Sequence, residues 1–228
     1  MSDLRGFFIT GTDTGVGKTW ISCGLITALR QRGHTVIGMK PVASGCQRTA
    51  AGLRNEDALR LQAVSSVQLS YEAVNPYAFE PPIAPHIAAC EARVEIAFER
   101  ICESAAMLGR HGDYLIVEGA GGWRVPLSKQ GDIGALAQVL GLPVVLVVGV
   151  RLGCINQALL SAEAIVARGL PLVGWTANVI DPTTERLAEN LQLLRNEIFA
   201  PCLGVVPFLP RFQPEVLAAC LNVKEILD

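Results

Sequence analysis

Charged residues are scarce in this sequence, and the two signs nearly cancel. Only 18% of the 228 residues are charged, with 19 Lys and Arg against 21 Asp and Glu and a formal net charge of −2 at pH 7. No run rich in lysine or arginine occurs. A protein without such a cluster generates no field strong enough to hold a phosphate backbone or an anionic membrane surface. The composition therefore argues against a protein that binds nucleic acid or a membrane.

The cysteine pattern and the hydrophobic runs exclude further classes. The seven cysteines are an odd number, and no C-x-x-C pair or zinc-type Cys/His spacing occurs, so we expect reduced thiols. One long apolar stretch, residues 133–150, is split by Gly141 and Pro143, which predicts a helix end and a buried strand rather than a membrane span. Because the first residues lack the apolar segment and cleavage site of a signal peptide, we expect a cytoplasmic protein.

The sequence does contain a regular alternation of short apolar runs with segments of helical period. Half of its residues are hydrophobic, and the alternation is typical of β–α units around a parallel sheet with helices on both faces. We therefore predict an α/β fold with a mostly parallel sheet and a single domain over residues 1–228. The expected strands are Phe7–Thr10, Thr35–Met39, Tyr114–Glu118, Val144–Val150, Leu172–Val179 and Cys202–Val206. The expected helices are Lys18–Arg32, Val94–Arg110, Ile133–Leu140, Asn156–Arg168 and Thr184–Ile198.

One segment, Pro41–Pro85, does not fit this alternation. It is rich in glycine and proline and shows only a short helical pattern around Asp57–Ala63, so we expect a long irregular connection. Such connections inside a compact α/β domain are usually functional. This one follows the second strand, at the carboxyl edge of the sheet, where ligands bind in open α/β folds.

A phosphate-binding loop is indicated by residues 7–19, FFITGTDTGVGKT, which combine an apolar strand, a glycine-rich turn and a helix start. In such a loop, backbone N–H groups and the helix N-terminus face an anion, as in P-loop NTPases. Lys18 can reach the outer phosphates of a nucleotide, and the Thr19 hydroxyl can bind a Mg²⁺ ion that bridges them. Five residues rather than the usual four separate Gly11 from Gly17, so a structural turn with a solvated lysine is the alternative.

Beyond the loop, short motifs follow one another in a fixed order. They are GTDT-x-VGKT (11–19), MKPVASG (39–45), GLRNEDA (52–58), VNPY (74–77), APH (84–86), VEGAGGW (117–123), LGCIN (152–156) and GW (174–175). In this order and spacing they resemble the motifs of the dethiobiotin synthetases over roughly residues 5 to 210. The resemblance implies a single-domain P-loop NTPase-like enzyme.

The resemblance also implies a reaction in biotin biosynthesis, the ATP-dependent closure of a cyclic urea. The diamine 7,8-diaminononanoate takes up CO2 as a carbamate, ATP phosphorylates the carbamate, and the second amine closes the ring with loss of phosphate. The chain has only four lysines, and the family assigns the counterparts of Lys18 and Lys40 to the reacting anions. The alternative for Lys40 is a strand-end lysine that reaches water. Thr14 and Ser44 hold the diamine or its carbamate by resemblance, with turn formation as the alternative.

A magnesium site is expected from three oxygen donors. Mg²⁺ prefers oxygen ligands and keeps several waters, so one hydroxyl with one or two carboxylates suffices. Thr19, Asp57 and Glu118 supply that set. Glu118 ends a strand, which brings its carboxylate to the carboxyl edge of the sheet, whereas Asp57 could instead cap the helix that begins beside it.

The remaining expected site residues come from the resemblance alone. For the nucleotide they are Gly15, Val16, Gly17, Lys18, Thr19, Trp20, Asp57, Glu118, Gly119, Ala120, Gly121, Asn178, Val179, Pro207, Phe208, Leu209 and Glu215. For the substrate they are Thr14, Lys40, Ser44, Gly153, Cys154, Ile155 and Asn156. The last four begin a helix whose free N–H groups receive the substrate carboxylate across a homodimer interface. We expect Cys154 to be structural, because urea closure needs no covalent intermediate, and Trp123 either covers the pocket or lies in the core.

Two other classes of protein compete with this interpretation. A partition ATPase would carry a signature lysine at the position of Asp13, and a metal-cluster carrier ATPase would carry paired metal-binding cysteines. An amide-forming ligase for a corrinoid-type acid would normally need a glutaminase region, for which we expect no room in a chain of this length.

Overall fold

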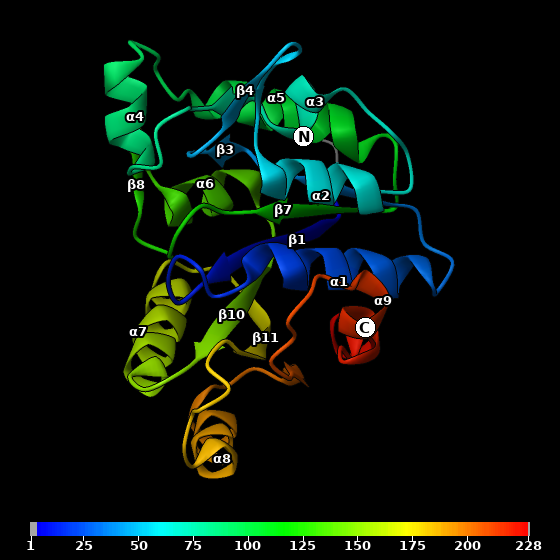
Figure 1. The fold of residues 1–228 in the computed structure, drawn as a ribbon, viewed down its shortest axis with the longest axis vertical. Coiled ribbons are helices and arrows are strands. Elements are labelled where there is room, and N and C mark those ends of the chain that lie inside the picture. Colours follow the sequence, from blue (N-terminus) through cyan, green and yellow to red (C-terminus); the bar gives the residue numbers. More distant parts are fainter. Residues whose placement is uncertain (1–3, 228) are drawn as a thin grey trace.

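A central sheet of six parallel strands organises the computed structural model, which describes residues 4–227 (Figure 1). The strand order is β12-β11-β10-β1-β7-β2, and every neighbouring pair is parallel. The strands are β1 (Gly6–Gly11), β2 (Val36–Met39), β7 (Tyr114–Glu118), β10 (Val144–Val150), β11 (Leu172–Val179) and β12 (Cys202–Val206). The predicted α/β class, the parallel sheet and its six strands are confirmed.

Helices cover both faces of the sheet, because successive side chains of a strand point to opposite sides. Phe7 and Ile9 of β1 belong to one core, and Phe8 belongs to the other. The core of Phe7 and Ile9 is closed by α1 (Lys18–Arg30), α9 (Pro214–Ala219) and the 3-10 helix η1 (Val223–Ile226). The core of Phe8 is closed by α5 (Phe98–Gly109), α6 (Ile133–Leu140), α7 (Cys154–Ala167) and α8 (Leu187–Glu197). Trp123 is 3% exposed within this second core, so it packs there rather than over a pocket.

The helix expected around Asp57–Ala63 is confirmed as α2 (Glu56–Val64), but the rest of Pro41–Pro85 was wrongly expected to be irregular, because it contains several short elements. Strands β3 (Val42–Ala43) and β6 (Tyr77–Ala78) pair in parallel, and β4 (Gln47–Thr49) and β5 (Gly52–Arg54) form a hairpin. The other helices of this region are α3 (Tyr71–Val74) and α4 (Pro85–Glu91). A further small hairpin, β8 (Pro126–Ser128) with β9 (Gly131–Asp132), follows β7. Strands this short leave no readable period in the sequence.

Three helix starts differ from the prediction for local backbone reasons. The helix expected from Val94 begins at Phe98, since Ala97 is extended at φ −87° and ψ 125°. The helix expected from Thr184 begins at Leu187, after Arg186 at φ 53°. The helix expected from Asn156 begins at Cys154, directly after Gly153 at φ 91°. Within residues 4–227, no helix combines the length and the apolar character that crossing a membrane requires.

Candidate active site

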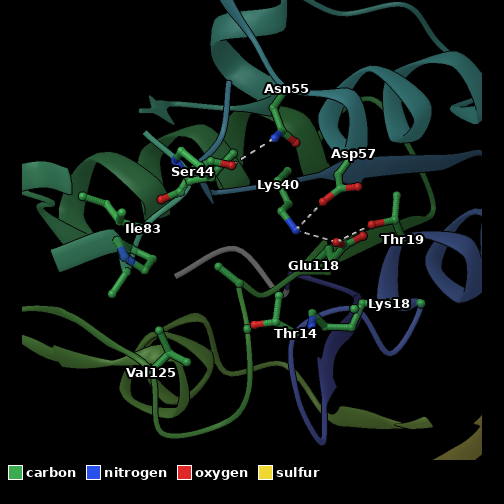
Figure 2. A pocket seen from close by; sticks show the side chains of 18 of the residues that line it. Thr14, Lys18, Thr19, Lys40, Ser44, Asn55, Asp57, Ile83, Glu118 and Val125 are labelled. Atoms are coloured by element: carbon green, nitrogen blue, oxygen red, sulfur yellow. Dashed lines mark hydrogen bonds and ion pairs between the residues drawn. The ribbon is translucent and has the colours of Figure 1, made fainter. Parts of the chain in front are cut away.

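A cavity of about 670 Å³ lies at the carboxyl ends of β1, β2 and β7. Its walls come from the phosphate loop, from the segment after β2, from the start of α2, from residues 82–85 and from the glycine-rich segment after β7. Figure 2 shows Lys40 pointing toward Asp57 and Glu118, with Thr14 and Lys18 approaching from the loop and Ser44, Ile83 and Val125 on the opposite side. The sequence-predicted residues that line the cavity are Thr14, Gly15, Gly17, Lys18, Thr19, Trp20, Lys40, Ser44, Asp57, Glu118, Ala120 and Gly121.

The phosphate loop is held in shape by its glycines and by Asn178. Gly15 and Gly17 have φ of 76° and 86°, the left-handed region that glycine adopts without strain. Asn178 Nδ2 donates to the carbonyl of Val16 at 2.9 Å, and a Cβ on Gly17 would lie 2.2 Å from that amide nitrogen. Gly17 therefore lets the loop rest directly on the end of β11.

Lys18 turns back over the loop. Its ammonium donates to the carbonyl of Asp13 at 2.8 Å, while the Asp13 carboxylate receives Arg151 Nη2 at 2.7 Å. Burial lowers the pKa of Lys18 to about 8, and the nearby charge of Lys40 acts in the same direction. Lys18 thus remains mostly protonated at pH 7 and lines the cavity as a cation.

Lys40 lies between two carboxylates and is itself buried in the wall of the cavity. Its Nζ is 2.5 Å from Glu118 Oε1 and 3.3 Å from Asp57 Oδ2, and it also donates to the carbonyl of Gly119 at 3.3 Å. Burial alone would lower the pKa of Lys40, but the two carboxylates outweigh it and raise the pKa above its usual value. Burial would likewise raise the pKa of Asp57, and Lys40 reverses that effect so that the pKa lies below its usual value. The strand-end lysine that reaches water is therefore excluded.

The predicted magnesium donors meet at this point. Thr19 Oγ1 donates to Glu118 Oε1 at 2.9 Å, and Glu118 is fully buried. Its second oxygen, Oε2, has no hydrogen-bond partner within residues 4–227. Over the same residues no cluster of three or more His, Cys, Asp and Glu side chains could hold a metal ion. Two carboxylates and a hydroxyl suit Mg²⁺, which keeps waters, rather than a metal that needs a closed protein shell.

The alternative role of Asp57 as a helix cap was wrong. Asn55 occupies the cap position of α2, and its side chain accepts the backbone N–H of Ala58 at 3.2 Å. Asp57 lies in the first turn of the helix, with its side chain 41% exposed and directed at Lys40. Asn55 also lines the cavity and was not among the predicted site residues.

The other predicted residues do not line this cavity. They are Val16, Gly119, Gly153, Cys154, Ile155, Asn156, Asn178, Val179, Pro207, Phe208, Leu209 and Glu215. Cys154 is 1% exposed at the start of α7, which fits the expected structural role. The cavity also has lining residues that were not predicted: Ala43, Asn55, Pro82, Ile83, Ala84, Pro85 and Val125.

Known proteins resemble this chain over nearly its whole length. The sequence matches the family described as "AAA domain" over residues 5–216. It is 56% identical over 224 residues to the "ATP-dependent dethiobiotin synthetase BioD" of Pseudomonas paraeruginosa, covering 98% of both chains. It is 53% identical over 224 residues to the protein of the same name from Cellvibrio japonicus, again covering 98% of both chains.

Solved structures share the fold at low identity. The septum site-determining protein MinD of Pyrococcus horikoshii aligns with 97% of this chain and 88% of its own length, with a TM-score of 0.59 and 15% identity. A ParA family ATPase of Chlorobium tepidum aligns with 98% of this chain and 92% of its own length, with a TM-score of 0.56 and 15% identity. These similarities support the P-loop NTPase-like architecture. At 15% identity they concern the fold alone and say nothing about the reaction.

Proposed function

This chain belongs to the family of ATP-dependent dethiobiotin synthetases, and we propose which of its residues carry out each step of that reaction. The enzyme is a carbon–nitrogen ligase of biotin biosynthesis that uses ATP to form dethiobiotin. The partition ATPase alternative is set aside, because the likeness to MinD and ParA at 15% identity concerns the fold alone. We treat residues 1–228 as one synthetase domain.

The chemistry brings two anions together. One amine of 7,8-diaminononanoate adds to CO2 and loses a proton, which gives a carbamate. A carbamate oxygen attacks the γ-phosphorus of ATP and ADP leaves. The second amine then attacks the carbon of this mixed anhydride, phosphate leaves with a proton released, and the urea ring closes. The phosphoryl step requires fixed positive charge between carbamate and γ-phosphate.

Lys18 and Lys40 supply that charge. Lys18 lies in the phosphate loop and Lys40 at the end of β2, so they face the cavity from two different elements. Because the neighbouring carboxylates raise the pKa of Lys40, this residue keeps its proton and acts as a cation rather than as a base. We infer that Lys40 stabilises the carbamate and the transferring phosphoryl group, and that Lys18 holds the outer phosphates.

We infer that Thr19, Asp57 and Glu118 hold Mg²⁺. The buried, unpartnered Oε2 of Glu118 supports this assignment, because an oxygen without a partner in an apolar setting costs free energy unless a ligand satisfies it. When bound, Mg²⁺ neutralises charge on the β- and γ-phosphates. The three side chains orient one another: Thr19 donates to Glu118, and Lys40 links Glu118 to Asp57.

The diamine fits on the side of the cavity opposite the carboxylates. Thr14 and Ser44 line it as polar groups, and Ser44 Oγ is buried without a hydrogen-bond partner in the described part of the chain. Ile83 and Val125 add apolar surface for the alkyl chain, as Figure 2 illustrates. We infer that Thr14 and Ser44 bind the amines or the carbamate.

The substrate carboxylate is assigned to the start of α7, across a homodimer. No side chain caps the start of α7, and the N–H of Cys154 already donates to the carbonyl of Arg151 at 3.0 Å, so the other N–H groups of this helix start are the ones that can receive an anion. Leu152 before this helix is 99% exposed, and Leu160 and Val166 on the helix are 58% and 60% exposed. Large apolar side chains that are exposed on one helix and just before it support an interface.

The base of ATP is assigned to the end of β11 and the segment after β12. Asn178 offers an amide beside the phosphate loop, and Val179, Pro207, Phe208, Leu209 and Glu215 follow by resemblance. Phe212, just beyond this segment, packs edge-on against Trp20 at 5.8 Å between ring centroids. Because Trp20 follows Thr19, that contact brings the C-terminal segment next to the phosphate loop.

We also propose a cytoplasmic location, supported by the free state of all seven cysteines.

The observation that carries these assignments is the placement of Lys40 between Asp57 and Glu118 in the cavity that holds the phosphate loop. The test follows phosphate release and the mass of the organic product with ATP, Mg²⁺, bicarbonate and 7,8-diaminononanoate, omitting each in turn. We expect phosphate release only with the complete mixture. In an Asp57→Asn variant we expect activity to fall and its Mg²⁺ requirement to rise. An unchanged Mg²⁺ requirement would overturn the metal assignment.

A further inference from the structure

Behind the cavity, buried hydrogen bonds centre on Tyr71, the first residue of α3. The Tyr71 hydroxyl accepts the backbone N–H of Asn55 at 2.7 Å and donates to Asn75 Oδ1 at 2.9 Å. Tyr71 and Asn55 are each 7% exposed, and Asn75 is 3% exposed. Tyr71 and Asn75 do not line the cavity, so they act on it only through their neighbours.

One arm of this network holds the backbone of Lys40. Asn75 Nδ2 donates to the carbonyl of Lys40 at 2.6 Å and to the carbonyl of Tyr77 at 3.1 Å. The N–H of Lys40 donates to the carbonyl of Val74 at 2.9 Å. Both backbone groups of the lysine are thus fixed by Val74, the last residue of α3, and by Asn75, which follows it.

The other arm holds the segment that carries Asp57. Asn55 caps α2 by accepting the N–H of Ala58 at 3.2 Å, and its backbone N–H is bound by Tyr71. Its Nδ2 also points to the carbonyl of Ser44 at 3.5 Å. The position of Asn55 therefore sets the first turn of α2, in which Asp57 reaches Lys40.

The contribution of the Tyr71 hydroxyl is hydrogen bonding rather than packing. A phenylalanine would fill the same space, and the Arg54 guanidinium lies 4.1 Å from the centre of the Tyr71 ring and would hold a phenyl ring as well. What tyrosine adds is the link between Asn55 and Asn75. Lys40 is fixed by the central sheet through β2, and α2 is anchored near its C-terminal end, where Leu61 is buried and Ser65 Oγ accepts the N–H of Gly38 at 2.9 Å. The first turn of α2, which carries Asp57, follows the β4–β5 hairpin, whose strands pair only with each other, and there a satisfied polar network adds a further geometric restraint.

We propose that Tyr71 is a positioning residue of the synthetase reaction, whose hydroxyl sets the Asp57 carboxylate relative to Lys40 through Asn55 and Asn75. The inference rests on the roles proposed above for Lys40 and Asp57. Groups that orient a metal ligand from behind typically account for about 10- to 100-fold in metal affinity or activity. A change of that size is expected when the hydroxyl is removed.

The test compares Tyr71→Phe with Tyr77→Phe. Tyr77 is a matched control, because it is 4% exposed and its hydroxyl accepts the backbone N–H of Ala97 at 3.0 Å, on a helix start outside the cavity. The measurements are thermal stability, kcat at saturating substrates, and Mn²⁺ affinity in the presence of a non-hydrolysable ATP analogue, followed by electron paramagnetic resonance. Both variants should lose similar thermal stability. Only Tyr71→Phe should lose kcat and Mn²⁺ affinity, each by about 10- to 100-fold.

Equal kinetic and Mn²⁺ effects in the two variants would overturn the proposal and leave Tyr71 as a core residue. If Tyr71→Phe yields too little folded protein, Asn75→Leu tests the same network, since a side chain of similar size removes the acceptor of the Tyr71 hydroxyl and the donor to the Lys40 carbonyl without burying a charge. The same losses are expected there, and wild-type values would refute the inference. Asp57→Asn distinguishes the proposed ligand role of Asp57 from the positioning role of Tyr71. If Asp57→Asn weakens Mn²⁺ binding while Tyr71→Phe does not, only the positioning role fails. If Asp57→Asn leaves Mn²⁺ affinity unchanged, the ligand assignment and the positioning role both fail.

Discussion

Replacing Lys40 by methionine keeps the length of the side chain and removes its charge. Lys40 is 4% exposed, and its ammonium contacts the fully buried Glu118 at 2.5 Å and Asp57 at 3.3 Å. Removing one partner of a buried ion pair costs about 3–5 kcal/mol, because an uncompensated charge stays buried. The Asp57 side chain is 41% exposed and can regain water, so we expect the lower end of that range.

A loss of about 3 kcal/mol corresponds to a fall in Tm of about 6–12 °C for a chain of this size. Mg²⁺ should restore part of this loss in the Lys40→Met variant, because the two carboxylates then lack their cation. The same change should lower kcat by about 10²- to 10³-fold, as for other groups that stabilise charge in a transition state. Tm with and without Mg²⁺, and single-turnover rates of ADP formation, measure both effects.

Lys129→Met is the control, because Lys129 is an exposed lysine on the turn between β8 and β9. It should leave Tm and kcat at wild-type values. A Tm for Lys40→Met within about 2 °C of wild type would contradict the buried ion pair, since that shift corresponds to less than about 1 kcal/mol. A kcat within tenfold of wild type would remove Lys40 from the phosphoryl step.

Three further outcomes are expected. Gly17→Ala should abolish ATP binding in equilibrium dialysis, because Gly17 has a φ of 86° and the added Cβ would lie 2.2 Å from the Asn178 side chain. Gly33→Ala is the control and should bind ATP normally, because Gly33 has a similar φ of 89° but no atom within 4 Å of the added Cβ. The pKa of Lys18 is about 8 before ATP binds, so about half of the lysine is protonated at pH 8, and binding of the ATP anion at that pH should take up about half a proton. Calorimetry in buffers of different ionisation enthalpy measures this uptake, and a release of protons on binding would disprove the expectation. Leu160→Glu should shift the mass measured by light scattering toward the monomer, and an unchanged mass would argue against α7 as the interface.

The central sheet was predictable because its strands are buried on both faces. Val144–Val150 is a continuous apolar run between helical patterns, Tyr114–Glu118 is one up to its last residue, and the structure reproduces the bounds of both. The region after β2 was not predictable in the same way. Elements such as Val42–Ala43 and Tyr77–Ala78 consist of two residues each, and they exist only because they pair with each other across the chain.

Some residues of the candidate site were likewise predictable from the sequence, and others were not. Lys40 and Glu118 were found because each stands where a buried strand ends, so the fold prediction itself places them at one edge. Ile83 and Val125 were missed because an apolar side chain in a loop has no chemical signature in sequence. Asn55 did carry a signal, as a preferred cap residue before a helix, but Asp57 is also a residue type that caps helices. Only the hydrogen bond to Ala58 distinguishes them.

Asp13 shows how a distant partner determines the role of a loop residue. From the sequence alone, Asp13 is notable only as a carboxylate at a position where partition ATPases carry a lysine. In the structure its carboxylate receives Arg151, from the segment between β10 and α7, and its carbonyl accepts Lys18. A lysine at this position would face Arg151 with like charge. Both side chains of the ion pair are more than 40% exposed, so it contributes little stability. Its effect is geometric: it connects the loop proposed to hold the phosphates with the helix start proposed to receive the substrate carboxylate.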